Sequence, residues 1–207
     1  RMAGTGKEDS LIGILDSLGN KREDFLKWIA GNRSEQLMAE GRENLFTPEE
    51  IQAMKALRNG NEQLFDAAKK KYDAFTRAIL DFQVDTGLLS KEMRDQWADA
   101  WYIPYYRQVD NETGQVAGPW TTKGIANQRS PAKKLKGGEA NINDPIENLF
   151  NYTAKAIDAS MKNEAMRRAV VNLGDTDMME RIDSPNKFDY QAIGKDVVKV
   201  NIDGQEN

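Results

Sequence analysis

The sequence contains no cysteine and no histidine. Disulfides, thiolate nucleophiles, Cys/His zinc sites and imidazole acid–base chemistry are therefore excluded for this chain. No apolar run approaches the ~20 residues that a transmembrane helix needs, and the N-terminus has no signal-peptide pattern. Because the first residue is Arg1 and not an initiator methionine, we expect the chain to be a fragment of a longer protein.

Hydrophobic residues are scarce and charged residues are abundant. Hydrophobic residues make up 39% of the chain, against about 45–50% in typical globular chains. Charged residues make up 30%, against about 25%. This balance favours long amphipathic helices with solvated faces over a compact sheet protein. The acidic pI of about 5.1 argues against nucleic acid coating the whole surface, but it leaves a local basic patch possible.

Two segments carry a strong helix start signal, Thr47-Pro48-Glu49-Glu50 and Asp144-Pro145-Ile146-Glu147. Each combines a capping residue, a proline at the first helical position and a carboxylate three residues after the cap. They predict helices from 47 to about 58 and from 145 to about 173. Glycine breaks and weaker periodicity predict the other helices, at 11–18, 21–30, 34–45, 61–85 and 91–100.

The longest regular apolar pattern lies in 61–85, at alternating spacings of three and four residues. Its members are Phe65, Ala68, Tyr72, Phe75, Ile79 and Phe82. We predict that this helix and 145–173 form the spine of an antiparallel bundle. A buried seam would pack within one chain, whereas an exposed one would pair two chains, so a homo-oligomer stays open.

The predicted fold is mainly α, a multi-helix antiparallel bundle in one domain over 1–207. Its core spans 25–173, with a basic loop at 121–144 and a C-terminal extension at 184–207. Because the residue before Pro104 is forced into extended geometry, we predict a small β-hairpin or an extended arm near 102–120. A short strand is predicted at 197–202.

The residues best suited to contact a partner lie in this arm and in the basic run that follows it. Between Thr121 and Gly138 there are five cations and no acid, although the chain as a whole has a net charge of −4. The candidate contact residues are Tyr105, Tyr106, Arg107, Trp120, Lys123, Arg129, Lys133, Lys134 and Lys136. The rings could stack bases while the cations hold phosphates, or the aromatic cluster that begins at Trp101 could simply pack the arm onto the helices. The basic run is either a solvated connector or a contact for nucleic acid, anionic lipid or an acidic protein.

Evidence for catalysis is weak. The acids Asp95 and Asp99 lie one helical turn apart, but such pairs are by default solvated surface charge. The segment Gly4-Thr-Gly6-Lys7 lacks the spacing of a phosphate-binding loop. We predict no catalytic residue, no metal site and no cofactor.

A family resemblance rests on several short motifs in a fixed order. They are Lys27-Trp28, Gly41-Arg42-Glu43, Gly87-Leu88-Leu89-Ser90, Trp101-Tyr-Ile-Pro-Tyr-Tyr-Arg107, Lys134-Leu-Lys-Gly-Gly138, and Asn148 with Ala156-Ile157 and Lys162-Asn163-Glu164-Ala165. Over roughly 25–170 the chain resembles the large polyvalent protein-associated domains of bacteriophage and conjugative-element proteins. This family brings no agreed catalytic residues.

The resemblance implies a helical module of a very long protein that travels with phage or plasmid DNA. We therefore expect a non-catalytic structural or interaction module, delivered with the genome and located in the virion or in the host bacterial cytoplasm. Its partners would be other domains of the parent protein, phage proteins or nucleic acid. The alternatives are a nucleic-acid-binding module that uses 121–138 and the adjacent aromatics, and, least favoured, a hydrolase-type enzyme domain.

Overall fold

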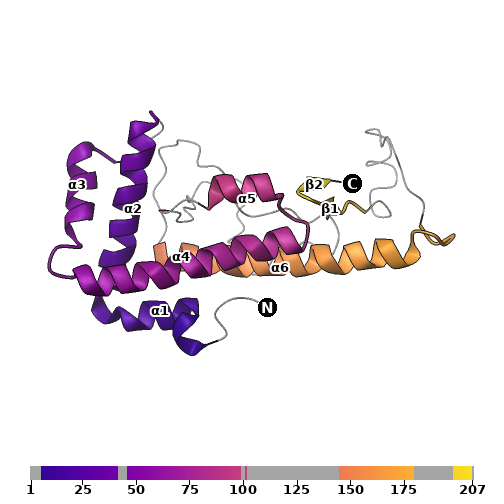
Figure 1. Cartoon of the computed structure of the whole chain (residues 1–207), viewed down its shortest axis with the longest axis horizontal. Helices are drawn as coiled ribbons and strands as arrows, with labels where there is room; N and C mark the ends of the chain where they lie inside the picture. The colour runs from indigo at the N-terminus through magenta and orange to yellow at the C-terminus, as the bar shows by residue number, and fades with distance from the viewer. Residues whose placement is uncertain (1–5, 42–45, 99–100, 102–144, 180–197, 207) are drawn as a thin grey trace, which may run out of the picture.

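The computed structural model describes residues 6–41, 46–98, 101, 145–179 and 198–206. Within these ranges it contains six α-helices and one two-stranded antiparallel hairpin (Figure 1). The prediction of a mainly α fold is confirmed. The hairpin or arm predicted near 102–120 and the basic loop at 121–144 lie outside the described residues.

The helices are α1 (Leu11–Ser17), α2 (Arg22–Ala39), α3 (Pro48–Ala56), α4 (Glu62–Asp85), α5 (Lys91–Trp97) and α6 (Pro145–Leu173). The strands are β1 (Asn201–Ile202) and β2 (Gln205–Glu206). Helix α3 begins with the predicted capping box. The Thr47 side chain accepts from the Glu50 amide at 3.2 Å, and the Thr47 amide donates to the Glu50 carboxylate at 2.8 Å.

Helix α2 runs without a break through Gly31, so the break predicted between the helices at 21–30 and 34–45 is wrong. Gly31 lies where α2 crosses α3. A Cβ atom placed on Gly31 would lie 2.7 Å from Met54 Cβ and 3.2 Å from the Ile51 carbonyl oxygen. The missing side chain therefore lets two helices approach closely, and it does not end the first of them.

Replacing Gly31 by valine is expected to lower the free energy of unfolding by about 2 kcal/mol, since overpacking a tight contact costs roughly 1–3 kcal/mol. The matched control is Ala39→Val, at an exposed position in the last turn of the same helix. Urea denaturation of both variants measures the difference. Equal stability of the two variants would show that the α2–α3 crossing tolerates a side chain.

The main core is formed by α1, α2, α4 and α6. Its members are Leu11, Ile14, Leu15, Leu18, Phe25, Leu26, Trp28, Ile29, Phe65, Ala68, Tyr72 and Leu149. The core therefore begins before residue 25, where the predicted core began. Because Phe65, Ala68, Tyr72 and Ile79 of the predicted seam are buried, the seam packs within the chain and does not pair two chains.

The two longest helices lie along each other and form the predicted spine (Figure 1). Phe65 near the start of α4 shares the core with Leu149 near the start of α6. At the far end the Asn163 side chain donates to the carbonyl oxygen of Thr86, just after α4, at 2.7 Å. The helices therefore run in the same direction, so the spine itself departs from the antiparallel bundle that was predicted.

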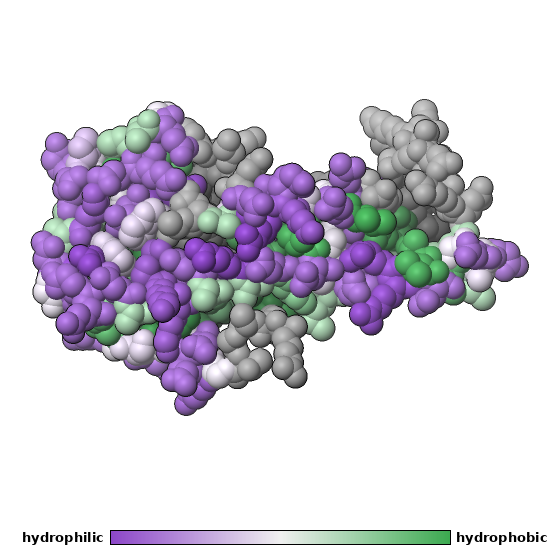
Figure 2. All heavy atoms as spheres, in the orientation of Figure 1, coloured by the Kyte–Doolittle hydropathy of each residue, from purple (hydrophilic) through white to green (hydrophobic). Residues whose placement is uncertain are grey.

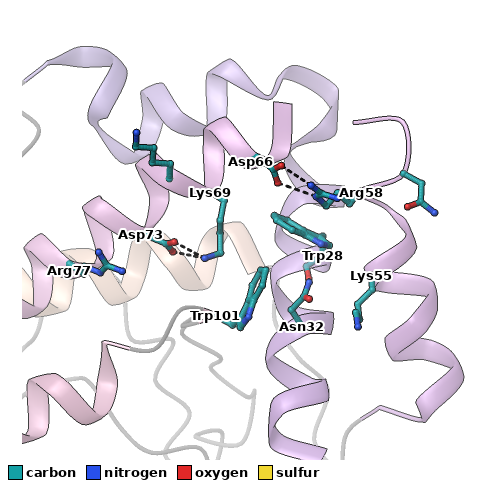
Figure 3. Close-up of a pocket in the computed structure, with 11 residues that line it drawn as sticks. Trp28, Asn32, Lys55, Arg58, Asp66, Lys69, Asp73, Arg77 and Trp101 are labelled. Carbon is teal, nitrogen blue, oxygen red and sulfur yellow. Dashed lines mark hydrogen bonds and ion pairs between the residues drawn. The ribbon is translucent and has the colours of Figure 1, made fainter. Parts of the chain in front are cut away.

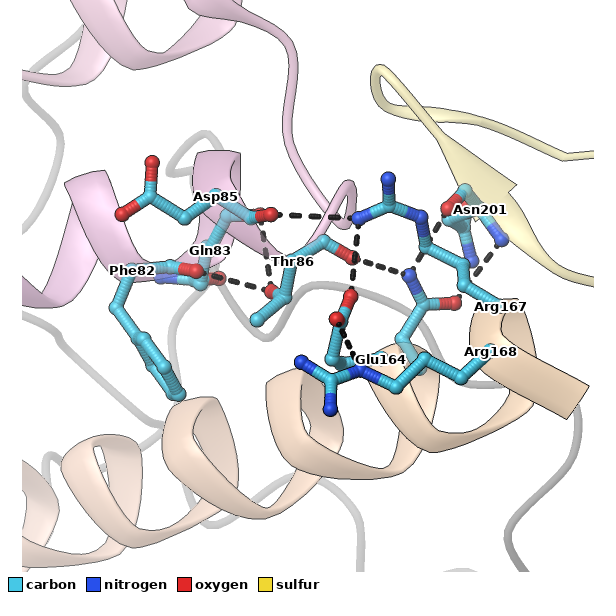
Figure 4. Close-up of polar contacts among 9 residues, drawn as sticks. Phe82, Gln83, Asp85, Thr86, Glu164, Arg167, Arg168 and Asn201 are labelled. Atoms are coloured by element: carbon cyan, nitrogen blue, oxygen red, sulfur yellow. Dashed lines mark hydrogen bonds and ion pairs between the residues drawn. The ribbon is translucent and has the colours of Figure 1, made fainter. Parts of the chain in front are cut away.

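The C-terminal hairpin is held against the end of α4 by polar contacts (Figure 4). The Gly204 amide donates to the Gly87 carbonyl oxygen at 3.0 Å. The Asn163 side chain of α6 donates to the Asn201 carbonyl oxygen at 2.9 Å and accepts from the Asn201 amide at 3.0 Å. Of the strand predicted at 197–202, residues 201 and 202 are extended and pair antiparallel with β2.

Candidate functional site

A groove of about 760 Å³ lies between α2, the end of α3 and the first half of α4, with Trp101 at one side (Figure 3). Its lining consists of five cations, two acids, two tryptophans and two asparagines: Lys55, Arg58, Lys69, Lys70, Arg77, Asp66, Asp73, Trp28, Trp101, Asn32 and Asn59. The face over these helices is mostly hydrophilic in Figure 2, whereas apolar side chains gather toward the C-terminal end of α6.

Helix α4 supplies five of the lining residues because they recur every three or four positions. Asp66, Lys69, Lys70, Asp73 and Arg77 form one polar stripe beside the buried seam. Cations from α3 and the turn after it complete the groove, because α3 folds back on α2.

Three of the groove cations are paired with carboxylates. Arg58 binds Asp66 through two hydrogen bonds, Nε to Oδ1 at 3.0 Å and Nη2 to Oδ2 at 2.6 Å. The hydrogen bond from Arg58 lowers the pKa of Asp66, and the hydrogen bond to Asp66 raises the pKa of Arg58. Lys69 Nζ lies 2.7 Å from both carboxylate oxygens of Asp73.

Lys55 is the third paired cation. Its Nζ atom donates to both carboxylate oxygens of Glu35 at 2.6 Å, and this hydrogen bond lowers the pKa of Glu35. Glu35 lies outside the groove lining. The pairing therefore ties α2 to α3 and places a positive group at the groove edge.

The other two cations, Lys70 and Arg77, make no hydrogen bond or ion pair with any residue that the structure describes, and both are exposed. The groove lining has more cations than acids, so its net charge is positive. Most of this excess charge belongs to Lys70 and Arg77, because neighbouring carboxylates compensate the other cations. An anionic ligand would find these two groups ready to bind.

Trp101 is a packing residue. Its ring meets the Trp28 ring edge to face, with centroids 5.2 Å apart and an interplanar angle of 86°. Lys69 Nζ lies 4.4 Å from the Trp101 ring centroid, in a cation–π contact. Trp28 is only 6% exposed, so its ring offers no free face. For Trp101, the packing interpretation of the aromatic cluster is the one that fits.

All nine candidate contact residues lie outside the described residues: Tyr105, Tyr106, Arg107, Trp120, Lys123, Arg129, Lys133, Lys134 and Lys136. The residues that flank their segment are described. Trp101, before the segment, and Ile146, after it, both pack against the main core, and Trp101 also lines the groove.

The acid pair considered for catalysis is incomplete in the described part of the chain. Asp95 pairs with Arg94 at 3.0 Å, and Asp99 is not described. Within the described ranges, no group of three or more acidic residues could hold a metal ion. None of the described helices is both long and apolar enough to cross a membrane.

Comparisons with protein-family models, with curated proteins and with solved structures give no match to this chain. The resemblance to polyvalent-protein domains stays a prediction.

Proposed function

We propose that the chain is a non-catalytic nucleic-acid-binding module of a larger bacteriophage or conjugative-element protein. The observation that supports this most directly is the positively charged groove, in which Lys70 and Arg77 are exposed and make no ion pair with any described residue. The same chain carries five further cations and no acid between Thr121 and Gly138. Nucleic acid is a polyanion that such positive charge attracts.

Nucleic acid explains this arrangement better than a lipid surface does. Membrane-surface helices combine cations with exposed large apolar side chains that enter the acyl region. No residue among the exposed large hydrophobics of the described ranges lines the groove; they are Ile12, Leu64, Phe150, Met161, Val171, Met178 and Ile202. A polar, cationic surface without apolar anchors is suited to phosphates.

The acids of the groove favour binding over catalysis. Asp66 and Asp73 each neutralise a cation, Arg58 and Lys69 respectively. The lowered pKa of Asp66 makes it a poor proton donor or acceptor near neutral pH, where acid–base catalysis needs a pKa close to 7. The resemblance over 25–170 supports a phage or conjugative-element context, in which the parent protein accompanies DNA.

Binding of fluorescently labelled oligonucleotides to the 207-residue chain tests the proposal. We expect single-stranded and duplex DNA to bind at low ionic strength and to dissociate as salt rises. The triple variant Lys133→Glu, Lys134→Glu and Lys136→Glu should weaken binding at least tenfold, because three phosphate contacts become repulsive.

The control triple variant is Lys7→Glu, Lys27→Glu and Lys91→Glu. It makes the same change in net charge at exposed positions outside the groove, and it should retain most of the affinity. No binding by the unmodified chain at low salt would refute the proposal. Equal loss in both triple variants would reduce it to a general effect of net charge.

A further inference from the structure

We infer that the groove binds one single strand of nucleic acid through its phosphates, with Lys70, Arg77 and Arg58 as the contact residues. This inference rests on the proposed function for its class of ligand. It adds a second contact surface, built from α4 and the end of α3, that is separate from the basic segment 121–138. It also predicts a preference for single strands over duplexes.

The size of the groove favours a single strand. Its volume of about 760 Å³ falls in the range of about 300–1,000 Å³ that encloses a small ligand. A few nucleotides of one strand can lie against the side of α4 that carries Lys70 and Arg77. A duplex is wider than its own major groove of about 12 Å, so it can present only one of its two backbones to these cations.

The free cations are spaced along the groove. Lys70 and Arg77 are seven residues apart on α4, which places them two turns apart on one face, about 10.5 Å along the helix axis. A strand that follows α4 therefore meets uncompensated positive charge at two separated points.

Arg58 adds a third contact, in which a phosphate can replace the Asp66 carboxylate as the hydrogen-bond acceptor. The guanidinium holds Asp66 in a bidentate pair whose side chains are 37% and 56% exposed. Such exposed pairs contribute little to stability, so exchanging the carboxylate for another anion costs the fold little. Phosphate accepts the same two parallel hydrogen bonds from arginine, so the Asp66 carboxylate marks a position where phosphate oxygens would lie.

The tryptophans give little sequence selectivity. Trp28 is buried, and the Trp101 ring packs against Trp28 and Lys69. Because no free face of Trp28 remains for a base to stack on, the strand is held by its backbone. Contacts to phosphates carry no sequence information, so we expect similar affinity for single strands of different sequence.

The test compares a short single strand with a duplex of the same length, over a series of salt concentrations. The double variant Lys70→Gln and Arg77→Gln should lose about tenfold in affinity for the single strand. It should also reduce the slope of log affinity against log salt by about 1.4, because each phosphate contact contributes about 0.7 for single strands. Affinity for the duplex should be nearly unchanged. The control double variant is Lys27→Gln and Lys91→Gln, outside the groove.

The substitution Asp66→Asn should change single-strand affinity in the opposite direction to the Lys70/Arg77 variant. Removing this carboxylate releases Arg58 and removes a negative charge, so single-strand affinity should rise about threefold, in line with the small energy of an exposed ion pair. Circular dichroism confirms that each variant is folded. Unchanged or weaker binding by the folded Asp66→Asn variant would overturn the assignment of Arg58.

The outcomes separate this inference from the proposed function. If the chain binds neither oligonucleotide, the proposed function fails. If the segment variant at 133, 134 and 136 loses binding but the Lys70/Arg77 variant keeps the single-strand slope of the unmodified chain, nucleic-acid binding stands and the groove site is refuted.

Discussion

Replacing Phe65 by alanine is expected to lower the free energy of unfolding by about 4 kcal/mol, within the roughly 3–5 kcal/mol typical of buried Phe→Ala changes. Phe65 is 0% exposed at the centre of the main core. Its ring meets Phe25 edge to face at 5.5 Å and lies 5.5 Å from the Trp28 ring. The substitution would leave a cavity where α4 joins α2.

The matched control is Phe150→Ala on α6, where the phenylalanine is 38% exposed. Its cost should stay within about 0.5 kcal/mol, as for most surface changes. Urea denaturation followed by circular dichroism measures both variants. A loss below about 1 kcal/mol for Phe65→Ala would contradict the placement of this ring in the core.

Local signals predicted most of the helical elements. The start of α3 was predictable from Thr47 and Glu50. The side chain of each residue accepts a hydrogen bond from the backbone amide of the other. Ser90 likewise caps α5, accepting from the Met93 amide at 3.2 Å. Such contacts lie within four residues, so the sequence shows both partners at once. The seam on α4 was predictable because apolar residues on one face of a helix recur every three or four positions in the sequence.

Features that depend on a second helix were not predictable in the same way. A glycine such as Gly31 has the same local appearance whether it ends a helix or lets a neighbouring helix approach, and only the nearby Met54 decides between them. The shared direction of α4 and α6 depends on the path of a long connection. Helix periodicity shows which face is buried and not which way the partner runs.

The groove illustrates the same limit for a site. Lys70 and Arg77 belong to a polar stripe that the sequence shows, and the ordinary interpretation of such a stripe is a solvated face. Arg58 joins them only because the turn after α3 brings it to Asp66. In the sequence, the acid-free run at 121–138 is distinctive by its charge alone. The groove cations were not predicted as a site, because their importance depends on packing.

Replacing Asn163 by leucine is expected to lower the free energy of unfolding by about 4 kcal/mol, because losing a hydrogen bond to a buried partner costs roughly 1–3 kcal/mol. Asn163 is 1% exposed. It donates to the carbonyl oxygens of Thr86 and Asn201 at 2.7 and 2.9 Å, and it accepts from the Asn201 amide at 3.0 Å. Leucine fills the space but satisfies none of these groups.

The loss of stability in Asn163→Leu should appear first where the hairpin meets the end of α4, since local opening can precede global unfolding. Amide hydrogen exchange should accelerate at Asn201 and Gly204, whose N–H groups donate to Asn163 and to Gly87.

The control is Ser160→Ala, one turn earlier on α6. Ser160 is 0% exposed, and its hydroxyl has no hydrogen-bond partner among the described residues. Its removal should leave stability unchanged or raise it, because an unsatisfied buried hydroxyl is itself unfavourable. Similar losses in both variants would show that α6 is sensitive to any buried change, and that the Asn163 hydrogen bonds do not hold the hairpin.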